Sequence, residues 1–212
     1  MCNKDIYVKL FSDNSWELYN QGSLEICSNS HADYLKTLLK VYKAPEERSD
    51  LLIVGGGDYQ IATDVGHLLK PKSTMTVIDP YVKDYQRFVC FYAEDIDQIQ
   101  LQDKINAGNL IVNDIPLKFS EAYQDIDQKR YDTIIVDCSE QIVKETEEIY
   151  CEAFIKTCAK LLKPKGNLYF YIPPKVSITP LLEKYFQFVD QSSNYIEAWD
   201  EFAYIVKLKL KV

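Results

Sequence analysis

The chain has 212 residues, of which 47% are hydrophobic and 26% are charged. This length and composition are typical of one globular domain with room for a small appendage. The net charge of −8 argues against nucleic acid as the main partner, because phosphate contacts need a basic face. No segment reaches the roughly 20 apolar residues that span a bilayer, and the N-terminus lacks the apolar core of a signal peptide. We therefore expect a cytoplasmic protein that binds neither membranes nor nucleic acid.

The six cysteines and two histidines show no metal-binding pattern. No C-x-x-C pair occurs and no zinc-site spacing is present, so we expect reduced thiols and no metal. Cys138 lies beside an acidic residue, but neither histidine is near it in the sequence, which argues against a thiol nucleophile.

The first 48 residues predict a small β-rich region followed by a helix. Alternating apolar and polar residues predict short strands at 6–11, 16–19 and 24–27, with a turn signal at 20–22. After Ser30, a candidate helix cap, apolar residues recur at helical spacing, and Pro45 should end the helix. We assign residues 1–48 to this N-terminal region and residues 49–212 to a catalytic domain.

Strands and helices alternate in the second region. Five apolar runs predict buried parallel strands, at 51–54, 74–78, 109–112, 131–136 and 167–172. Helical patterns fall at about 60–69, 81–93, 116–125, 145–162 and 178–187. The polar stretch 94–107 gives no clear pattern, and the chain closes with an antiparallel pair at about 187–190 and 202–210. This order predicts an α/β fold with a doubly wound, Rossmann-like parallel sheet.

Acidic residues follow four successive strands of this predicted sheet. The first strand ends in Gly55-Gly56-Gly57-Asp58, and the next three end at Asp79, Asp114 and Asp137. In an open parallel sheet, ligands bind beyond the carboxyl ends of the strands, so these acids should meet at one crevice. A ligand rich in hydroxyl and amino groups explains such a set.

The residue types indicate what this ligand is. Gly55, Gly56 and Gly57 let the backbone approach a ligand closely, and Asp58 would repel a pyrophosphate but attract an ammonium or sulfonium group. Asp79 could accept hydrogen bonds from ribose hydroxyls, and Asp114 from an adenine amino group. The pattern favours an S-adenosylmethionine-type nucleoside over NAD.

Several segments resemble the spermidine synthase family. LLIVGGGDYQIATDV is similar to its glycine-rich segment with the motif G-G-G-D-G-G, and TVIDPYV to its second strand with the motif E-I-D. YDTIIVDCSEQ resembles Y-D-V-I-I-V-D-S-S-D-P, and CEAFIKTCAKLLKPKGNLYF resembles the helix, turn and strand that follow. Upstream, ELYNQGSLEICSNSHADYLKTLL resembles a hairpin and a helix with a Y-H-E-M or Y-Q-E-M motif. The resemblance covers about residues 16–172 and implies the class I S-adenosylmethionine-dependent transferase fold and a homodimer or higher homo-oligomer.

The resemblance also implies roles for individual residues. Tyr34 matches the tyrosine that contacts the nucleoside or the amine, and Asp58 matches the acid that holds the amino group of the aminopropyl chain. Asp114 matches the acid near adenine. Asp137 matches the acid proposed to take a proton from the attacking amine, and Glu140 matches a second acid that helps to bind it. The implied reaction transfers an aminopropyl group from decarboxylated S-adenosylmethionine to a diamine such as putrescine and releases methylthioadenosine, with no metal and no permanently bound cofactor.

The chain departs from the family at several of these motifs. Val77 replaces the glutamate of E-I-D, which leaves Asp79 as the nearby acid, and Leu35-Lys36 replace the residues after the motif tyrosine. The loop after Glu140 lacks the prolines of D-P-x-G-P. Two alternatives therefore stay open: an S-adenosylmethionine-dependent methyltransferase, and a non-catalytic nucleoside-binding relative.

Overall fold

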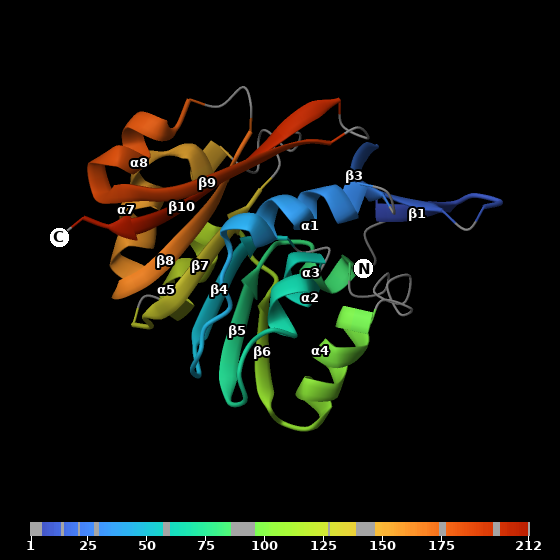
Figure 1. Ribbon diagram of the computed structural model, residues 1–212, viewed down its shortest axis with the longest axis horizontal. Coiled ribbons are helices and arrows are strands. Elements are labelled where there is room, and N and C mark those ends of the chain that lie inside the picture. The colour runs from blue at the N-terminus through green and yellow to red at the C-terminus, as the bar shows by residue number, and fades with distance from the viewer. Residues whose placement is uncertain are drawn as a thin grey trace.

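The computed structural model describes residues 6–13, 15–20, 22–27, 30–56, 60–85, 96–126, 128–138, 147–173, 177–196 and 200–211. A seven-stranded sheet with the strand order β6-β5-β4-β7-β8-β10-β9 forms its main body, and a three-stranded sheet, β1-β2-β3, lies beside it (Figure 1). The strands are β1 Ile6–Leu10, β2 Trp16–Asn20, β3 Ser23–Cys27, β4 Asp50–Gly55, β5 Ser73–Ile78, β6 Leu110–Ile115, β7 Tyr131–Asp137, β8 Leu162–Ile172, β9 Phe186–Ile196 and β10 Glu201–Leu210. The helices are α1 Ser30–Val41, α2 Gln60–Gly66, α3 Val82–Tyr85, α4 Ile96–Asn106, α5 Phe119–Ile126, the 3-10 helix η3 Glu147–Tyr150, α7 Glu152–Leu161 and α8 Thr179–Tyr185.

The large sheet confirms the predicted doubly wound α/β architecture. Strands β4 to β8 pair in parallel, as expected for strands joined by helical crossovers, and β10 and β9 add an antiparallel edge. The small sheet is antiparallel and matches the predicted N-terminal strands. Because the parallel strands share one direction, their carboxyl ends all lie at one edge of the sheet.

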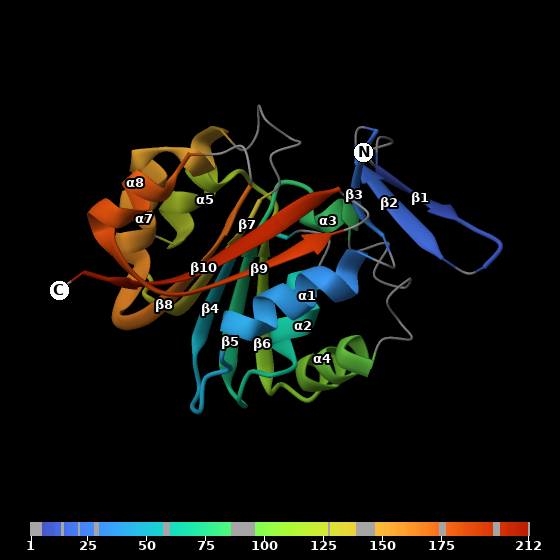
Figure 2. The same ribbon diagram turned by 45° about the horizontal axis from the view of Figure 1, so that its top comes forward.

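Helices cover both faces of this sheet (Figure 2). On one face, α1, α2 and α4 enclose a cluster that includes Leu51, Ile53 and Leu101. On the other, α5, η3, α7 and α8 enclose a cluster that includes Phe154 and Phe170. Alternate residues of β4 and β8 serve opposite clusters, because side chains of a strand alternate between the faces of a sheet. The parallel strands are therefore apolar on both sides, as their sequence predicts.

Helix α1 packs on the sheet through one face. Tyr34, Leu38 and Val41 are buried at the spacing of successive helical turns. The ring of Tyr42, just beyond the helix, packs on Tyr169 of β8 with 5.3 Å between ring centroids. Leu39 shares the apolar pattern but is 43% exposed, because it lies on the outer side of the helix. The helix thus joins the core of the large sheet, while the division of the chain at residue 48 stays a prediction.

Helix α4 lies within 94–107, the stretch that the sequence left undecided. Leu101 of this helix is 1% exposed and packs in the hydrophobic cluster on this face of the sheet. A Cβ at Gly66 of α2 would lie 2.8 Å from Leu101 Cδ1, so Leu101 packs directly over this glycine. The helix depends on a tertiary contact that a polar local pattern does not reveal.

Several predicted boundaries differ from the structure; β9, for example, runs over Phe186–Ile196 and not only over 187–190. The helix expected at 145–162 is divided into η3 and α7, because Cys151 between them has an extended backbone (φ −109°, ψ 160°). The segment 163–166, expected as a turn, lies inside β8. A Cβ at Gly166 would come within 2.8 Å of the Asp132 carbonyl oxygen, so this glycine lets β8 lie close against β7. Of the helix expected at 81–93, residues 81–85 are described, and Val82–Tyr85 form α3.

No helix in the described ranges is both long and apolar enough to cross a membrane.

An ionic clamp joins the strands at the edge of the sheet opposite their carboxyl ends. Lys163 Nζ lies 2.8 Å from Asp132 Oδ2 and 3.1 Å from Asp50 Oδ2. The Asp50 amide also donates to Asp132 Oδ2 at 2.8 Å, and Thr74 Oγ1 donates to Asp50 Oδ1 at 2.7 Å. These contacts link β5, β4, β7 and β8. Burial opposes the charged forms, but the hydrogen bonds and charges of the clamp outweigh it, so the pKa of Asp50 is lowered and that of Lys163 is raised.

Removing the clamp lysine should cost stability in a pH-dependent way. We expect Lys163→Met to lower the free energy of unfolding near neutral pH by about 1 kcal/mol, because the pair is half exposed. A carboxyl with a lowered pKa in the folded state stabilises above its unfolded pKa and loses that effect as the pH falls through its folded pKa. Urea unfolding should therefore show the difference shrinking below about pH 4. Lys165→Met, at an exposed position of the same strand, is the control. An equal difference at pH 3 and pH 7 would contradict the clamp.

Candidate functional site

The carboxyl ends of β4, β5, β6 and β7 bring predicted site residues to one edge of the sheet. Gly55 of β4 pairs in register with Asp137 of β7, and Asp114 of β6 pairs with Val77 of β5. Asp79 directly follows β5, and its amide donates to the Ile115 carbonyl oxygen at 3.2 Å, which prolongs the pairing of β5 with β6. Asp79, Asp114 and Asp137 are each half-buried. Gly57, Asp58 and Glu140 lie outside the described residues, so their roles stay predictions.

The glycine turn after β4 packs directly against Asp137. Gly55 and Gly56 have φ values of +80° and +63°, a region that side chains rarely adopt. A Cβ at Gly55 would collide with the Asp137 carbonyl oxygen and would lie 2.7 Å from Cys138 Sγ. A Cβ at Gly56 would lie 3.4 Å from Asp137 Oδ2. The sequence predicted that these glycines allow close approach to a ligand; in the structure they also allow close approach of β7.

Tyr34 and Asp137, both predicted as catalytic, are in direct contact. Tyr34 Oη donates to Asp137 Oδ1 at 2.5 Å. The tyrosine comes from α1 and is 8% exposed, whereas the aspartate ends β7. A hydrogen bond to an ionised carboxylate is stronger than one between neutral groups. One carboxylate oxygen is thus fixed by Tyr34, and the other lies beside Gly56.

Asp79 is held by a local turn, and the small sheet packs next to it. Asp79 Oδ1 accepts a hydrogen bond from the Tyr81 amide at 2.7 Å. Tyr81 then packs against a cluster that contains Ile6 of β1 and Leu18 of β2. The N-terminal strands are therefore positioned at the edge of the sheet that carries the site.

Cys138 shows how the charges of the site act on a neighbour. The thiol is buried and donates to the Val54 carbonyl oxygen at 3.6 Å. Burial raises its pKa well above the ordinary value, and the negative charges of Asp137 and Asp79 raise it further. The thiol is therefore protonated at neutral pH and is a poor nucleophile. Its carbonyl oxygen accepts a hydrogen bond from Tyr150 Oη at 2.7 Å, which fixes the backbone just after Asp137.

Sequence reasoning missed one aromatic residue at this edge. Tyr171 of β8 packs against Tyr34 with 5.8 Å between ring centroids and 68° between ring planes. Its position near the carboxyl end of the fifth predicted parallel strand was the available signal. In an apolar strand, however, a tyrosine at that position has the same pattern as a plain core residue.

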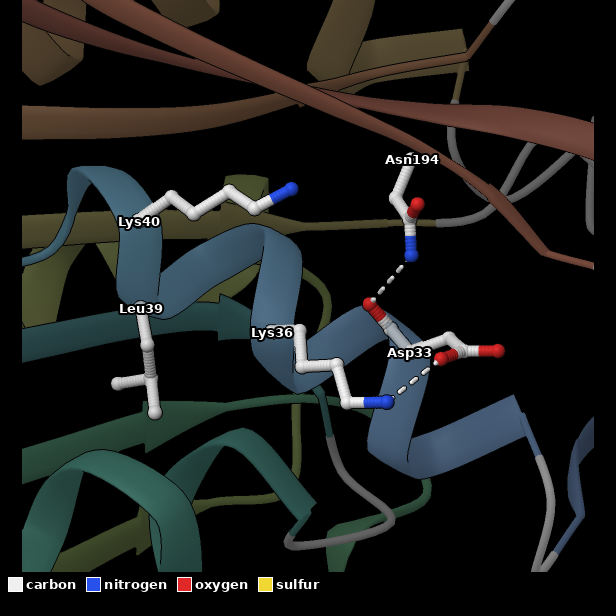
Figure 3. Close-up of a pocket in the computed structure, with 5 residues that line it drawn as sticks. All are labelled: Asp33, Lys36, Leu39, Lys40 and Asn194. Atoms are coloured by element: carbon white, nitrogen blue, oxygen red, sulfur yellow. Dashed lines mark hydrogen bonds and ion pairs between the residues drawn. The ribbon is translucent and has the colours of Figure 1, made fainter.

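A separate groove runs between α1 and β9 (Figure 3). It has a volume of about 590 Å³ and is lined by Asp33, Lys36, Leu39, Lys40 and Asn194. Lys36 pairs with Asp33 at 3.1 Å, and Asn194 Nδ2 donates to the Asp33 carbonyl oxygen at 3.5 Å. None of the predicted site residues that the structure describes lines it. It is an open surface groove, separate from the predicted residues at the sheet edge.

Comparison with known proteins shows the family of this chain. The sequence profile of the spermine/spermidine synthase domain matches residues 34–206. A comparison with curated protein sequences gives no match.

Solved structures share the fold at low sequence identity. A spermidine synthase in complex with the transition-state analogue AdoDATO is 14% identical, with a TM-score of 0.67 over 98% of this chain and 74% of that chain. Spermidine synthase from Thermotoga maritima is 13% identical, with a TM-score of 0.64 over 98% of this chain and 73% of that chain. The N-methyltransferase NodS from Bradyrhizobium japonicum WM9, in complex with S-adenosyl-L-homocysteine, is 16% identical, with a TM-score of 0.56 over 86% of each chain. This chain spans only 48% of TrmN from Thermus thermophilus, which is 14% identical with a TM-score of 0.55 over 85% of this chain.

The packing of Gly55 against β7 can be tested with a matched glycine. Gly22 has a φ of +82°, but a Cβ at this position would have nothing within 4 Å of it. We expect Gly22→Ala to cost about 1–2 kcal/mol from backbone strain alone. Gly55→Ala should cost roughly 1–3 kcal/mol more, because its methyl group must displace the end of β7. Chemical denaturation of both variants measures the difference, and equal losses would show that Gly55 is needed only for its backbone conformation.

Proposed function

This chain belongs to the spermine/spermidine synthase domain family, and from that premise we propose that it is an aminopropyltransferase. The proposed reaction transfers the aminopropyl group of decarboxylated S-adenosylmethionine to a diamine such as putrescine and releases methylthioadenosine. The observation that carries this proposal is the 2.5 Å hydrogen bond between Tyr34 and Asp137 at the carboxyl edge of the sheet. A small-molecule amine partner, a homodimer or higher homo-oligomer, and a cytoplasmic location belong to the same proposal.

The chemistry requires little from the protein beyond placement and proton transfer. The lone pair of the neutral amine attacks the methylene carbon next to the sulfonium, a C–N bond forms, and the C–S bond breaks with its electrons going to sulfur. The new ammonium then loses a proton, which we assign to Asp137 Oδ2, the oxygen beside Gly56. Tyr34 holds Oδ1, so the carboxylate is oriented before the amine arrives.

The other acids of the site suit the donor. The carboxylates of Asp79, Asp114 and Asp137 lie at one edge, and their repulsion is relieved by a positively charged sulfonium compound. We propose that Asp79 accepts from the ribose hydroxyls and Asp114 from the adenine amino group. Asp58 is proposed to hold the amino group of the aminopropyl chain, and Glu140 to bind the acceptor amine.

A second candidate function is methyl transfer from S-adenosylmethionine. The similarity in fold to NodS favours it. Val77, which stands where spermidine synthases carry a ribose-binding glutamate, instead favours a third candidate, a non-catalytic relative. If neither donor reacts and a nucleoside still binds, the protein is a non-catalytic relative.

An activity assay separates the catalytic proposal from a structural role. With decarboxylated S-adenosylmethionine and putrescine, we expect methylthioadenosine release that falls about 10²–10⁴-fold in Asp137→Asn, because the base is lost. Tyr34→Phe should lower the rate roughly 10–100-fold, since a hydrogen bond to a charged group is removed. Asp125→Asn and Tyr204→Phe, at exposed positions of the same domain, are the matched controls. An Asp137→Asn variant as active as the native protein would refute the assignment.

Ligand-induced thermal shifts distinguish the two donors. We expect methylthioadenosine to raise the melting temperature more than S-adenosylhomocysteine, because the latter carries a carboxylate into a site rich in acids. A larger shift with S-adenosylhomocysteine would favour methyl transfer, and no shift with either nucleoside would remove both functions.

A further inference from the structure

Tyr171 stands beside Asp137 on the neighbouring strand. Phe170 pairs in register with Val136 in the parallel pair of β7 and β8, so the next residues along each strand, Tyr171 and Asp137, are neighbours at the end of that ladder. Neighbouring residues in register point to the same face of a sheet. For Tyr171 this is the face covered by α1, because it belongs to the same hydrophobic cluster as Tyr34.

Tyr34 contacts both Tyr171 and Asp137. Its hydroxyl contacts Asp137 Oδ1 at 2.5 Å, and its ring meets that of Tyr171 nearly edge-on at 5.8 Å. Tyr171 is 9% exposed and packs next to Ile205, its register partner on β10. Two aromatic rings and one carboxylate thus bound the same small region. The proposed proton transfer uses Tyr34 and Asp137 but gives Tyr171 no role.

We infer that Tyr171 is a specificity-determining residue whose ring packs against the alkyl chain of the amine acceptor, beside the nitrogen that Asp137 orients. This inference rests on the proposed function and names the acceptor class more narrowly: an alkylammonium with an unsubstituted methylene chain. An aromatic face attracts an alkylammonium group and excludes water from its methylenes. The ring gives no such advantage to an alkyl chain that carries a hydroxyl group. That hydroxyl would lose its bound water at the ring and would gain no hydrogen-bond partner there.

Binding measured without turnover tests this role. Isothermal titration calorimetry in the presence of methylthioadenosine gives the dissociation constants of putrescine and of its hydroxylated analogue 1,4-diamino-2-butanol. We expect Tyr171→Leu to raise the putrescine dissociation constant about tenfold and to reduce the preference for putrescine over the hydroxylated analogue. Tyr171→Phe should retain the native putrescine affinity and the native preference for putrescine, since it keeps the aromatic ring. The affinity for methylthioadenosine itself should not change in either variant.

Control variants separate this role from packing. Tyr204→Leu alters a tyrosine on the adjacent strand β10 that is 44% exposed and should leave putrescine affinity unchanged. If Tyr171→Leu does not fold, as judged by its melting transition, Tyr171→Met replaces the ring with a longer, flexible chain that adapts to irregular gaps. A folded Tyr171→Leu or Tyr171→Met protein with native putrescine affinity and selectivity overturns the inference.

The binding measurements, together with the activity assay, distinguish a failure of this inference from a failure of the proposed function. If the native protein binds putrescine but releases no methylthioadenosine, the aminopropyltransferase proposal fails, and the dissociation constants of the Tyr171 variants still decide the role of the ring. If the native protein binds no amine in the presence of methylthioadenosine, both proposals fail.

Discussion

The hydrogen bond from Tyr34 to Asp137 ties the N-terminal helix to the functional edge of the sheet. The two residues are 103 positions apart in the sequence, and they meet only when α1 has packed across the strands. One carboxylate oxygen is then fixed by Tyr34, and the other lies beside Gly56. The orientation of the carboxylate therefore depends on the helix, on the glycine turn and on the register of β4 with β7. A change at any of these three places would therefore alter the orientation of the Asp137 carboxylate.

Acids stand at both ends of the parallel strands. At the amino ends, Asp50 and Asp132 share one ion-pair partner, Lys163. At the carboxyl ends, burial raises the pKa of the Cys138 thiol, and the negative charges of Asp137 and Asp79 raise it further. Clustered like charges cost stability in the folded protein, and a cationic ligand relieves that cost on binding. This charge is one reason why we propose a sulfonium nucleoside and an amine as the ligands of the carboxyl edge.

Much of the architecture could be predicted from the sequence, because apolar strands and helices alternate and acids stand at the strand ends. The structure brings Tyr34 and Asp137 together and places Asp79 and Asp114 at the same edge, as expected. Helix α4 could not be predicted, because its local pattern is polar and its buried residue, Leu101, packs on a different helix, at Gly66 of α2. Tyr171 was missed for a similar reason: strand periodicity gives the face of a residue but not its neighbours on other strands. The roles of Gly57, Asp58 and Glu140 remain predictions.

A crystal structure of the protein with methylthioadenosine is the most direct test of this account. We predict that the nucleoside lies across the carboxyl ends of β4, β5 and β6, with the ribose at Asp79, the adenine at Asp114 and the sulfur facing Asp137. A nucleoside bound elsewhere, for example in the groove between α1 and β9, with Asp79, Asp114 and Asp137 away from it, would contradict the central claim.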